Sequence, residues 1–174
     1  SEDWNTVRAS SLVDDITGAA RSKFPVEGFE DCRLWTGADG AYHHASATVR
    51  DLVENTDGRC EMALICFDKQ WRIDDLLVVR DYEHDKTQKN WMPIAGSPGS
   101  FLYLCDPTIV IEVSNNGRTT EIARHVSPAC LVDLRGGSQL IPYGTGWLCI
   151  THEVAWRPER VYLHRFVRFD SDFR

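Results

Sequence analysis

The feature that most constrains the fold is a series of short β-rich runs separated by tight-turn residues. The runs are Ala41–Val49, Glu61–Phe67, Leu76–Arg80, Ser100–Leu104, Thr108–Val113, Thr120–His125, Gly146–Glu153 and Arg160–Phe169. Between them stand turn pairs such as Asp57-Gly58 and Asn116-Gly117, which favour antiparallel hairpins. A helical pattern is weak throughout, with one short turn expected near Val13–Ala20. The sequence therefore predicts an antiparallel all-β fold.

Three all-β architectures compete for this pattern: a sandwich, a closed barrel and a propeller. A polar motif followed by strand, turn and strand recurs near residues 28, 88 and 135. The interval, about 50 residues, suits a four-stranded propeller blade. With roughly 45 residues per blade, 174 residues make three to four blades. We expect one β-propeller-like domain over residues 1–174, with a poorly defined start at residues 1–25 that resembles an incomplete blade.

Charge and hydropathy narrow the classes of partner. The net charge of −7 gives no electrostatic basis for binding nucleic acid or an anionic membrane. No apolar run approaches the roughly 20 residues that span a bilayer. The first residues, Ser1 to Trp4, lack the basic and then apolar pattern of a signal peptide. These observations favour a cytoplasmic protein with no nucleic-acid or membrane partner.

The six cysteines carry no metal-site spacing. They contain no C-x-x-C pair, so no zinc ribbon is predicted and we expect no bound metal. Cys66, Cys105 and Cys149 lie in apolar runs. We expect them to be buried, reduced thiols that pack as small hydrophobic side chains.

The motif Glu30-Asp31-Cys32-Arg33 places charges inside an apolar run, where they are costly unless paired. Strand alternation would put Glu30 and Cys32 on one face, and Asp31 and Arg33 on the other. Desolvation and a nearby guanidinium act on a carboxyl pKa in opposite directions. An aspartate in that balance can serve as a general acid or base, and a structural Asp–Arg pair between strands is the alternative.

Two further motifs offer binding groups. In Lys89-Asn90-Trp91 the ammonium could hold phosphate, and the indole could either stack on a sugar or fill the core. Arg135 precedes the paired glycines Gly136 and Gly137, which permit close backbone approach or form a bare turn.

Histidines mark the two C-terminal strands. His152 and Glu153 end one apolar run, while His164 follows Tyr162 in the next. A single strand histidine usually has a structural role, but two on neighbouring strands favour a site.

In this order the motifs resemble the five-bladed β-propeller of the β-mannoside phosphorylase family and its mannosyltransferase relatives, especially a branch fused to bacterial glycosyltransferase modules. The matching segments are Gly28–Trp35, Thr48–Arg50, Gln88–Pro93, Cys105–Thr108, Arg135–Gln139, His152–Val154 and Tyr162–Val167. They extend from about residue 26 to the C-terminus. Cys32 stands where the phosphorylase motif has proline, and Gln88 where the branch has glutamate.

The resemblance implies a sugar site in which Asp31 protonates the glycosidic oxygen and phosphate attacks the anomeric carbon. One protein carboxyl then suffices, unlike the two of most glycosidases. Candidate substrate- and phosphate-binding residues are Glu30, Arg33, Arg50, Lys89, Asn90, Trp91, Asp106, Arg135, His152, Glu153, Tyr162 and His164. No cofactor is expected beyond a co-substrate, which is phosphate, a sugar phosphate or a nucleotide sugar.

Three functions remain open on sequence alone. The first is an enzyme that transfers or phosphorolyses a β-mannoside-like sugar, and the second is a non-catalytic glycan-binding module that serves a glycosyltransferase. The third is a structural fragment that mediates assembly. Carbohydrate is the expected ligand, and the exposed strand edges of an open propeller predict self-association or association with a glycosyltransferase module.

Overall fold

The computed structural model describes residues 26–36, 43–51, 53–69, 71, 73–83, 85–126 and 133–174. Every regular element within these ranges is a β-strand, and neighbouring strands are antiparallel. The expected all-β class is therefore confirmed, while the helical turn expected near Val13–Ala20 lies outside the described residues. No helix in the described part of the chain is long and apolar enough to cross a membrane.

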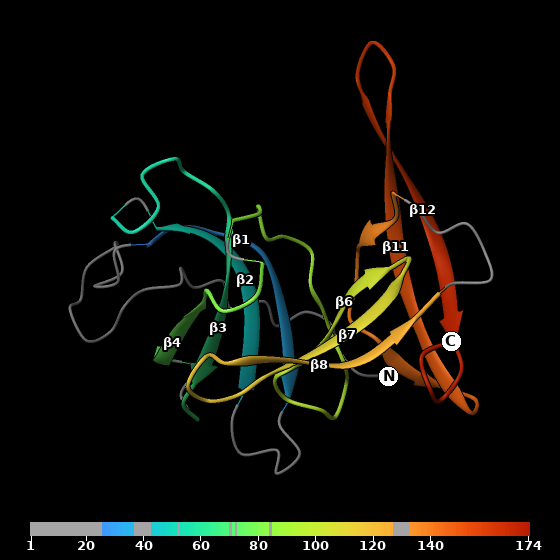
Figure 1. Cartoon of the computed structure of the whole chain (residues 1–174), viewed down its shortest axis with the longest axis horizontal. Helices are drawn as coiled ribbons and strands as arrows, with labels where there is room; N and C mark the ends of the chain where they lie inside the picture. The colour runs from blue at the N-terminus through green and yellow to red at the C-terminus, as the bar shows by residue number, and fades with distance from the viewer. Residues whose placement is uncertain are drawn as a thin grey trace, which may run out of the picture.

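The first sheet is a four-stranded meander at the left of Figure 1. Its strands follow the chain in order: β1 (Val26–Thr36), β2 (His43–Asp51), β3 (Glu61–Phe67) and β4 (Ile73–Val79). Each strand after β1 reverses direction and pairs with the one before it, so only neighbouring runs need to meet.

The second sheet repeats this order in the middle of the molecule (Figure 1). It consists of β5 (Met92–Pro93), β6 (Ser100–Cys105), β7 (Thr108–Val113) and β8 (Thr119–His125). The hairpin between β7 and β8 turns at Gly117, whose φ of 81° is in the left-handed region where glycine is favoured. The Asn-Gly signal for this hairpin is thus confirmed.

The third sheet is three strands wide, whereas the other two are four strands wide, because two of its strands share one edge of the central strand. Its central strand, β11 (Gly146–Trp156), pairs along its full length with β12 (Arg160–Phe169). The other edge of β11 is shared by two short strands, β9 (Arg135–Gly136) and β10 (Ile141–Tyr143). The β11–β12 hairpin extends well beyond the other sheets in Figure 1.

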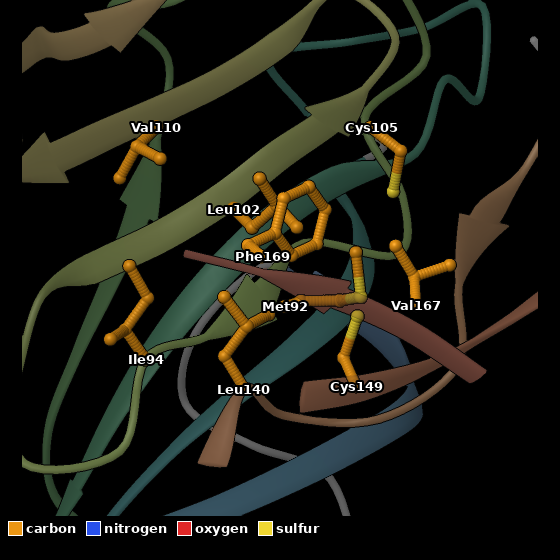
Figure 2. Close-up of a cluster of buried hydrophobic side chains, with 9 residues drawn as sticks. All are labelled: Met92, Ile94, Leu102, Cys105, Val110, Leu140, Cys149, Val167 and Phe169. Carbon is orange, nitrogen blue, oxygen red and sulfur yellow. The ribbon is translucent and has the colours of Figure 1, made fainter. Parts of the chain in front are cut away.

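Two apolar clusters join the three sheets face to face. Between the first and second sheets pack Met62, Val79, Trp91, Phe101, Ile109, Ile111 and Val113. Between the second and third sheets pack Met92, Ile94, Leu102, Cys105, Val110, Leu140, Cys149, Val167 and Phe169 (Figure 2). Alternation along each strand supplies one apolar face to each cluster, which is why the sheets stack in chain order.

The sequence located most of the long strands and missed the shortest, while β1 was not among the β-rich runs although its Glu30–Arg33 motif was treated as part of a strand. Glu61–Phe67, Thr108–Val113 and Arg160–Phe169 match residue for residue, and the other runs differ by a few residues at their ends. β5, β9 and β10 contain only two or three residues each, too few to show an alternating pattern. They form because a longer neighbouring strand offers them backbone hydrogen bonds.

The described cysteines are free thiols. Cys105 and Cys149 are buried, and burial raises the pKa of each thiol to about 12, so both stay protonated at neutral pH. Cys66 is only partly buried, in contrast to expectation, and Cys32 is exposed. Cys130 lies outside the described residues.

One arginine neutralises two buried carboxylates at the end of the first sheet. Asp51 and Glu61 are 2% and 6% exposed. Arg80 contacts an oxygen of each through Nη2 and Nε, the Nε–Glu61 Oε1 distance being 3.0 Å. Asp51 also accepts the backbone N–H groups of Val53 and Glu54 through Oδ1, which fixes the loop that follows β2.

Arg80→Met should lower the free energy of unfolding by about 2 kcal/mol, because two buried carboxylates lose their counter-ion. Partial exposure of Arg80 keeps the loss below that of a fully buried pair. Urea denaturation at neutral pH measures it. Arg124→Met, which removes an exposed pair with Glu121, is the matched control and should cost under about 1 kcal/mol. Equal losses in the two variants would contradict this account of Arg80.

Candidate functional site

Polar side chains gather where the first strands of the three sheets approach one another. The contributing segments are β1, the end of β2, the residues just before β5, and β9 with the middle of the β11–β12 hairpin. Arg33 on β1 reaches both of the other sheets, as its hydrogen bonds show. Residues from six separate sequence segments therefore lie together, and we call this group the cation cluster: Glu30, Asp31, Arg33, Arg50, Lys89, Asn90, Arg135, His152 and His164.

A β-bulge in β1 sets the direction of the Glu30–Arg33 side chains. Glu30 pairs with Thr48 and Arg33 with Ser46, so three steps on β1 match two steps on β2. Asp31 and Cys32 occupy the bulge, and Asp31 has a φ of 54°. The expected alternation is therefore wrong, because the extra residue brings Glu30 and Arg33 onto the same face and leaves Asp31 exposed between them.

Arg33 binds backbone carbonyl groups of both other sheets. Its Nη1 donates to the carbonyl oxygen of Trp91 at 3.2 Å, and its Nη2 to that of Gly136 at 3.0 Å. The planar guanidinium suits such a fork of two acceptors. Arg33 thus serves as a bridge between sheets, and the structural pair with Asp31 that the sequence left open is replaced by these two contacts.

Glu30 holds the two cations predicted from later motifs. Its Oε1 accepts a hydrogen bond from Arg50 Nη1 at 2.8 Å, and its Oε2 lies 3.6 Å from Lys89 Nζ. The hydrogen bond and the charge of Arg50 are the main causes that lower the pKa of the Glu30 carboxyl, and Lys89 lowers it further. Three residues spread over some 60 positions of sequence are thereby fixed in one exposed ion-pair group.

Asn90 and Gly136 make a close backbone contact beside this group. Asn90 has a φ of 62°, a conformation that asparagine tolerates better than most residues. A Cβ placed on Gly136 would lie 2.1 Å from the Asn90 carbonyl oxygen and 2.6 Å from Met92 Cγ. The predicted role of the paired glycines in close approach is therefore confirmed at Gly136.

The histidines lie on facing positions of the third sheet. His152 is opposite His164 on β12 and opposite Arg135 on β9, and its ring centroid is 5.6 Å from that of Tyr162. Partial burial lowers the pKa of His152, and the neighbouring His164, Arg135 and Arg33 lower it further, while Asp31 opposes them. His152 is therefore neutral at pH 7 and can accept or donate a hydrogen bond.

A cavity of about 300 Å³ opens next to the cluster. Lys89, Asn90, Arg135 and Gly136 line one part of it, and Tyr103, Leu104 and Cys105 at the end of β6 line another. Cations outnumber carboxylates in the cluster although the chain as a whole is acidic. The site therefore suits a small ligand that carries negative charge and an apolar surface.

Three predicted residues lie elsewhere. Trp91 is 0% exposed, packs against Phe101 and Tyr103, and so offers no stacking surface to a sugar. Glu153 lies on the opposite face of β11 from His152, because neighbours on a strand alternate, and it binds Arg165 at 2.6 Å. Asp106 is in the turn between β6 and β7, and the described contacts do not join it to the cluster.

A polar network behind Trp91 was not predicted. The indole N–H donates to Gln88 Oε1 at 3.1 Å, and Gln88 Nε2 donates to the carbonyl oxygen of Glu83 at 3.0 Å. Tyr103, which lines the cavity, donates to Glu83. Gln88 is 3% exposed. Its neutral amide forms hydrogen bonds with the buried groups around it and avoids the free-energy cost of burying a charge. The sequence signal was Gln88 itself, which stands where the resembled branch has glutamate.

Within the described residues, no group of three or more histidine, cysteine or acidic side chains is placed to hold a metal ion. Comparisons with protein-family models, curated proteins and solved structures found no match to this chain.

Arg135→Gln should raise the pKa of His152, because the substitution removes one of the cations that oppose protonation. Since the folded pKa is below the unfolded value of about 6.5, stability should fall as the pH drops through about 6.5, and less steeply in this variant. NMR titration of the histidine ring signals gives the pKa. Arg165→Gln, on the opposite face, is the control; a His152 pKa that does not move in Arg135→Gln would contradict the proposed proximity.

Gly136→Ala should destabilise the protein by about 2 kcal/mol or more, because the new Cβ meets backbone at 2.1 Å. Gly96→Ala is the matched control. It has open space around the Cβ and should cost only about 1 kcal/mol, from its φ of +78°. Thermal unfolding of both variants compares the two, and a Gly136→Ala protein as stable as Gly96→Ala would refute the close approach.

Proposed function

We propose that this protein is a carbohydrate-active enzyme of the β-mannoside phosphorylase and mannosyltransferase type, built on part of a β-propeller. The observation that carries the proposal is the convergence of motif residues from β1, β2, the segment before β5, and the third sheet in one cluster, of which Lys89, Asn90 and Arg135 line the cavity. These motifs are dispersed over more than 100 positions of sequence, and a shared ligand gives them a common use beyond the contacts that they make with one another.

The topology supports the propeller part of the proposal. Three antiparallel sheets follow one another along the chain, the first two as meanders and the third with β9 and β10 on the same edge of β11. The first strands lie at the contacts between sheets, where β1 meets β5 and β9 meets β6. They stack face to face through two apolar clusters, as adjacent blades do. First strands that meet around a common site are the arrangement that a blade-by-blade fold gives.

The charges support the substrate class. Lys89 and Arg135 line the cavity, and Arg50 forms an ion pair with Glu30, the same carboxylate that Lys89 contacts. Such a set can hold a phosphate dianion, either free or as part of a sugar phosphate. Tyr103, Leu104 and Met92 give the same cavity an apolar side against which a sugar ring can lie.

Asp31 is the proposed proton donor. The bulge and its left-handed φ direct this carboxyl out of the strand ladder, and bulges commonly re-aim side chains beside active sites. In the reaction, the Asp31 carboxyl protonates the glycosidic oxygen as the C1–O bond breaks. A phosphate oxygen forms the new bond to C1, and the proton that phosphate loses restores the acid.

Asp31→Asn should reduce turnover by a factor of about 10² to 10⁴, the usual contribution of a general acid. The assay measures phosphate release from a panel of sugar 1-phosphates with acceptor sugars. Asp133→Asn is the matched control, because Asp133 is also exposed and also has a positive φ, of 69°. Equal activity in Asp31→Asn and wild type would refute the assignment of the acid.

The same samples distinguish the glycan-binding alternative. A folded wild-type protein that binds sugar without turnover, and loses binding in Arg135→Ala, would favour a non-catalytic module that serves a glycosyltransferase. Trp91→Ala is not informative here, since its ring belongs to the core.

A further inference from the structure

One face of the third sheet combines exposed aromatic rings with basic side chains. The β11–β12 register places the even-numbered residues of both strands on this face, which we call the outer face. Arg135 of β9 lies on it opposite His152, and so do two residues of β10. The odd-numbered residues pack against the second sheet, so the outer face points away from the core. Its large exposed side chains are Ile141, Tyr143, Trp156, Tyr162 and Phe166.

The strands of the outer face contribute positive charge to it and no carboxylate. Arg135, Arg160 and Arg168 are exposed, and none of them forms an ion pair with another described residue. By contrast, Arg165 pairs with Glu153 on the opposite face. The potential over the outer face is therefore positive, although the whole chain carries a net charge of −7.

The carboxylates beside the outer face belong to neighbouring segments. The charge of Asp31, on β1, reaches His152. Glu159 and Asp170 stand just outside the two ends of β12. None of these three residues lies among the rings in the middle of the face.

Basic and aromatic positions alternate along the sheet. On β12 the outer-face residues are, in order, Arg160, Tyr162, His164, Phe166 and Arg168. At the extended-strand rise, basic positions four residues apart are separated by about 13 Å. The rings between them are accessible, since Phe166 is 77% exposed. The face therefore offers spaced cations with flat apolar surfaces between them.

We propose that the outer face binds an acidic oligosaccharide, in which sugars that carry a carboxylate or sulfate group are separated by uncharged sugars. Charge complementarity determines the sign of the ligand, because three arginines without an anionic partner face solvent here. A guanidinium binds a carboxylate or sulfate through two parallel hydrogen bonds. The exposed rings can lie against the apolar faces of the uncharged sugars.

Other occupants fit the charges less well. A second copy bound through the same face would bring arginine to arginine, with no carboxylate on the face to pair with either. Nucleic acid carries a phosphate on every nucleotide, so its charges are closer together than the arginines are. The net charge of −7 also opposes the approach of so dense a polyanion. An acidic glycan carries fewer charges over the same length.

The outer face is continuous with the cation cluster. Arg135, His152 and His164 belong to both, and Arg135 also lines the cavity. One end of a glycan on the face can therefore enter the cavity, and this last step rests on the proposed function. Binding on the face goes beyond that function, because it needs neither turnover nor phosphate.

Isothermal titration calorimetry in a buffer without phosphate tests the proposal. The probes are a heparin octasaccharide, which carries sulfate, and a hyaluronan octasaccharide, in which glucuronate alternates with an uncharged sugar. Wild type should bind at least one of them, and more weakly as NaCl rises from about 50 to about 200 mM. The methyl ester of the hyaluronan oligomer is its uncharged match and should bind at least about tenfold more weakly than the acid.

Substitutions on the two faces of β12 locate the binding surface. Combined Arg160→Gln and Arg168→Gln should weaken binding of the acidic probe by about tenfold or more, and Phe166→Ala should weaken it as well. Arg165→Gln and Leu163→Ala are the matched controls on the opposite face, and they should bind as wild type does. Circular dichroism checks that every variant folds.

Failure of wild type to bind either acidic probe, equal binding of the methyl ester, or unchanged binding in the double arginine variant overturns the proposal. A single-stranded thymidine oligonucleotide should bind more weakly than the glycan. Tighter binding of this oligonucleotide, lost in the double arginine variant, also overturns the proposal and makes nucleic acid the ligand of the face. Glycan binding without any turnover would refute the proposed activity alone, whereas Asp31-dependent turnover without glycan binding would refute only the present inference.

Discussion

The hydrogen bonds of Arg33 to two distant carbonyl groups are the contact on which the arrangement of the site depends. Each sheet is held internally by its own ladder, and apolar clusters join neighbouring sheets in pairs. Arg33 joins β1 to the segment before β5 and to β9 at once. Apolar packing is not directional, whereas a guanidinium fork fixes both distance and angle. This contact therefore determines where Glu30 and Asp31 stand relative to the later motifs.

Several unfavourable local features coincide at this position. β1 gives up regular pairing at the bulge, Asp31 and Asn90 adopt left-handed backbone conformations, and Gly136 has no room for a side chain. Each lowers stability slightly, and each lies within the cation cluster or directly beside it. Conformations of this kind persist where the surrounding structure enforces them, and they concentrate at functional sites. The ordinary strands and their clusters supply the stability that offsets them.

The sequence predicted what depends on neighbours along the chain. Alternation and the Asn-Gly turn were enough to locate β7, β8 and β12, and motif order indicated that Lys89 and Arg50 serve one site. Features that depend on residues distant in the sequence could not be predicted from it. These are the two-residue strands, the bulge that places Arg33 on the same face as Glu30, and the core position of Trp91. Glu153 is a different case, because strand alternation alone predicts that its side chain lies on the opposite face of the strand from that of His152. Alternation along β11 places Glu153 and His152 on opposite faces whatever the order of the motifs.

The bridge made by Arg33 has a consequence for how this site can vary in evolution. Both of its acceptors are main-chain oxygens, belonging to Trp91 and Gly136. A carbonyl is present whatever side chain its residue carries, so packing, and not the bond to Arg33, determines which residues can stand at those positions. Correlated substitution is then not expected between Arg33 and either acceptor. Methods that infer contacts from covariation would therefore overlook the hydrogen bonds that join the three sheets.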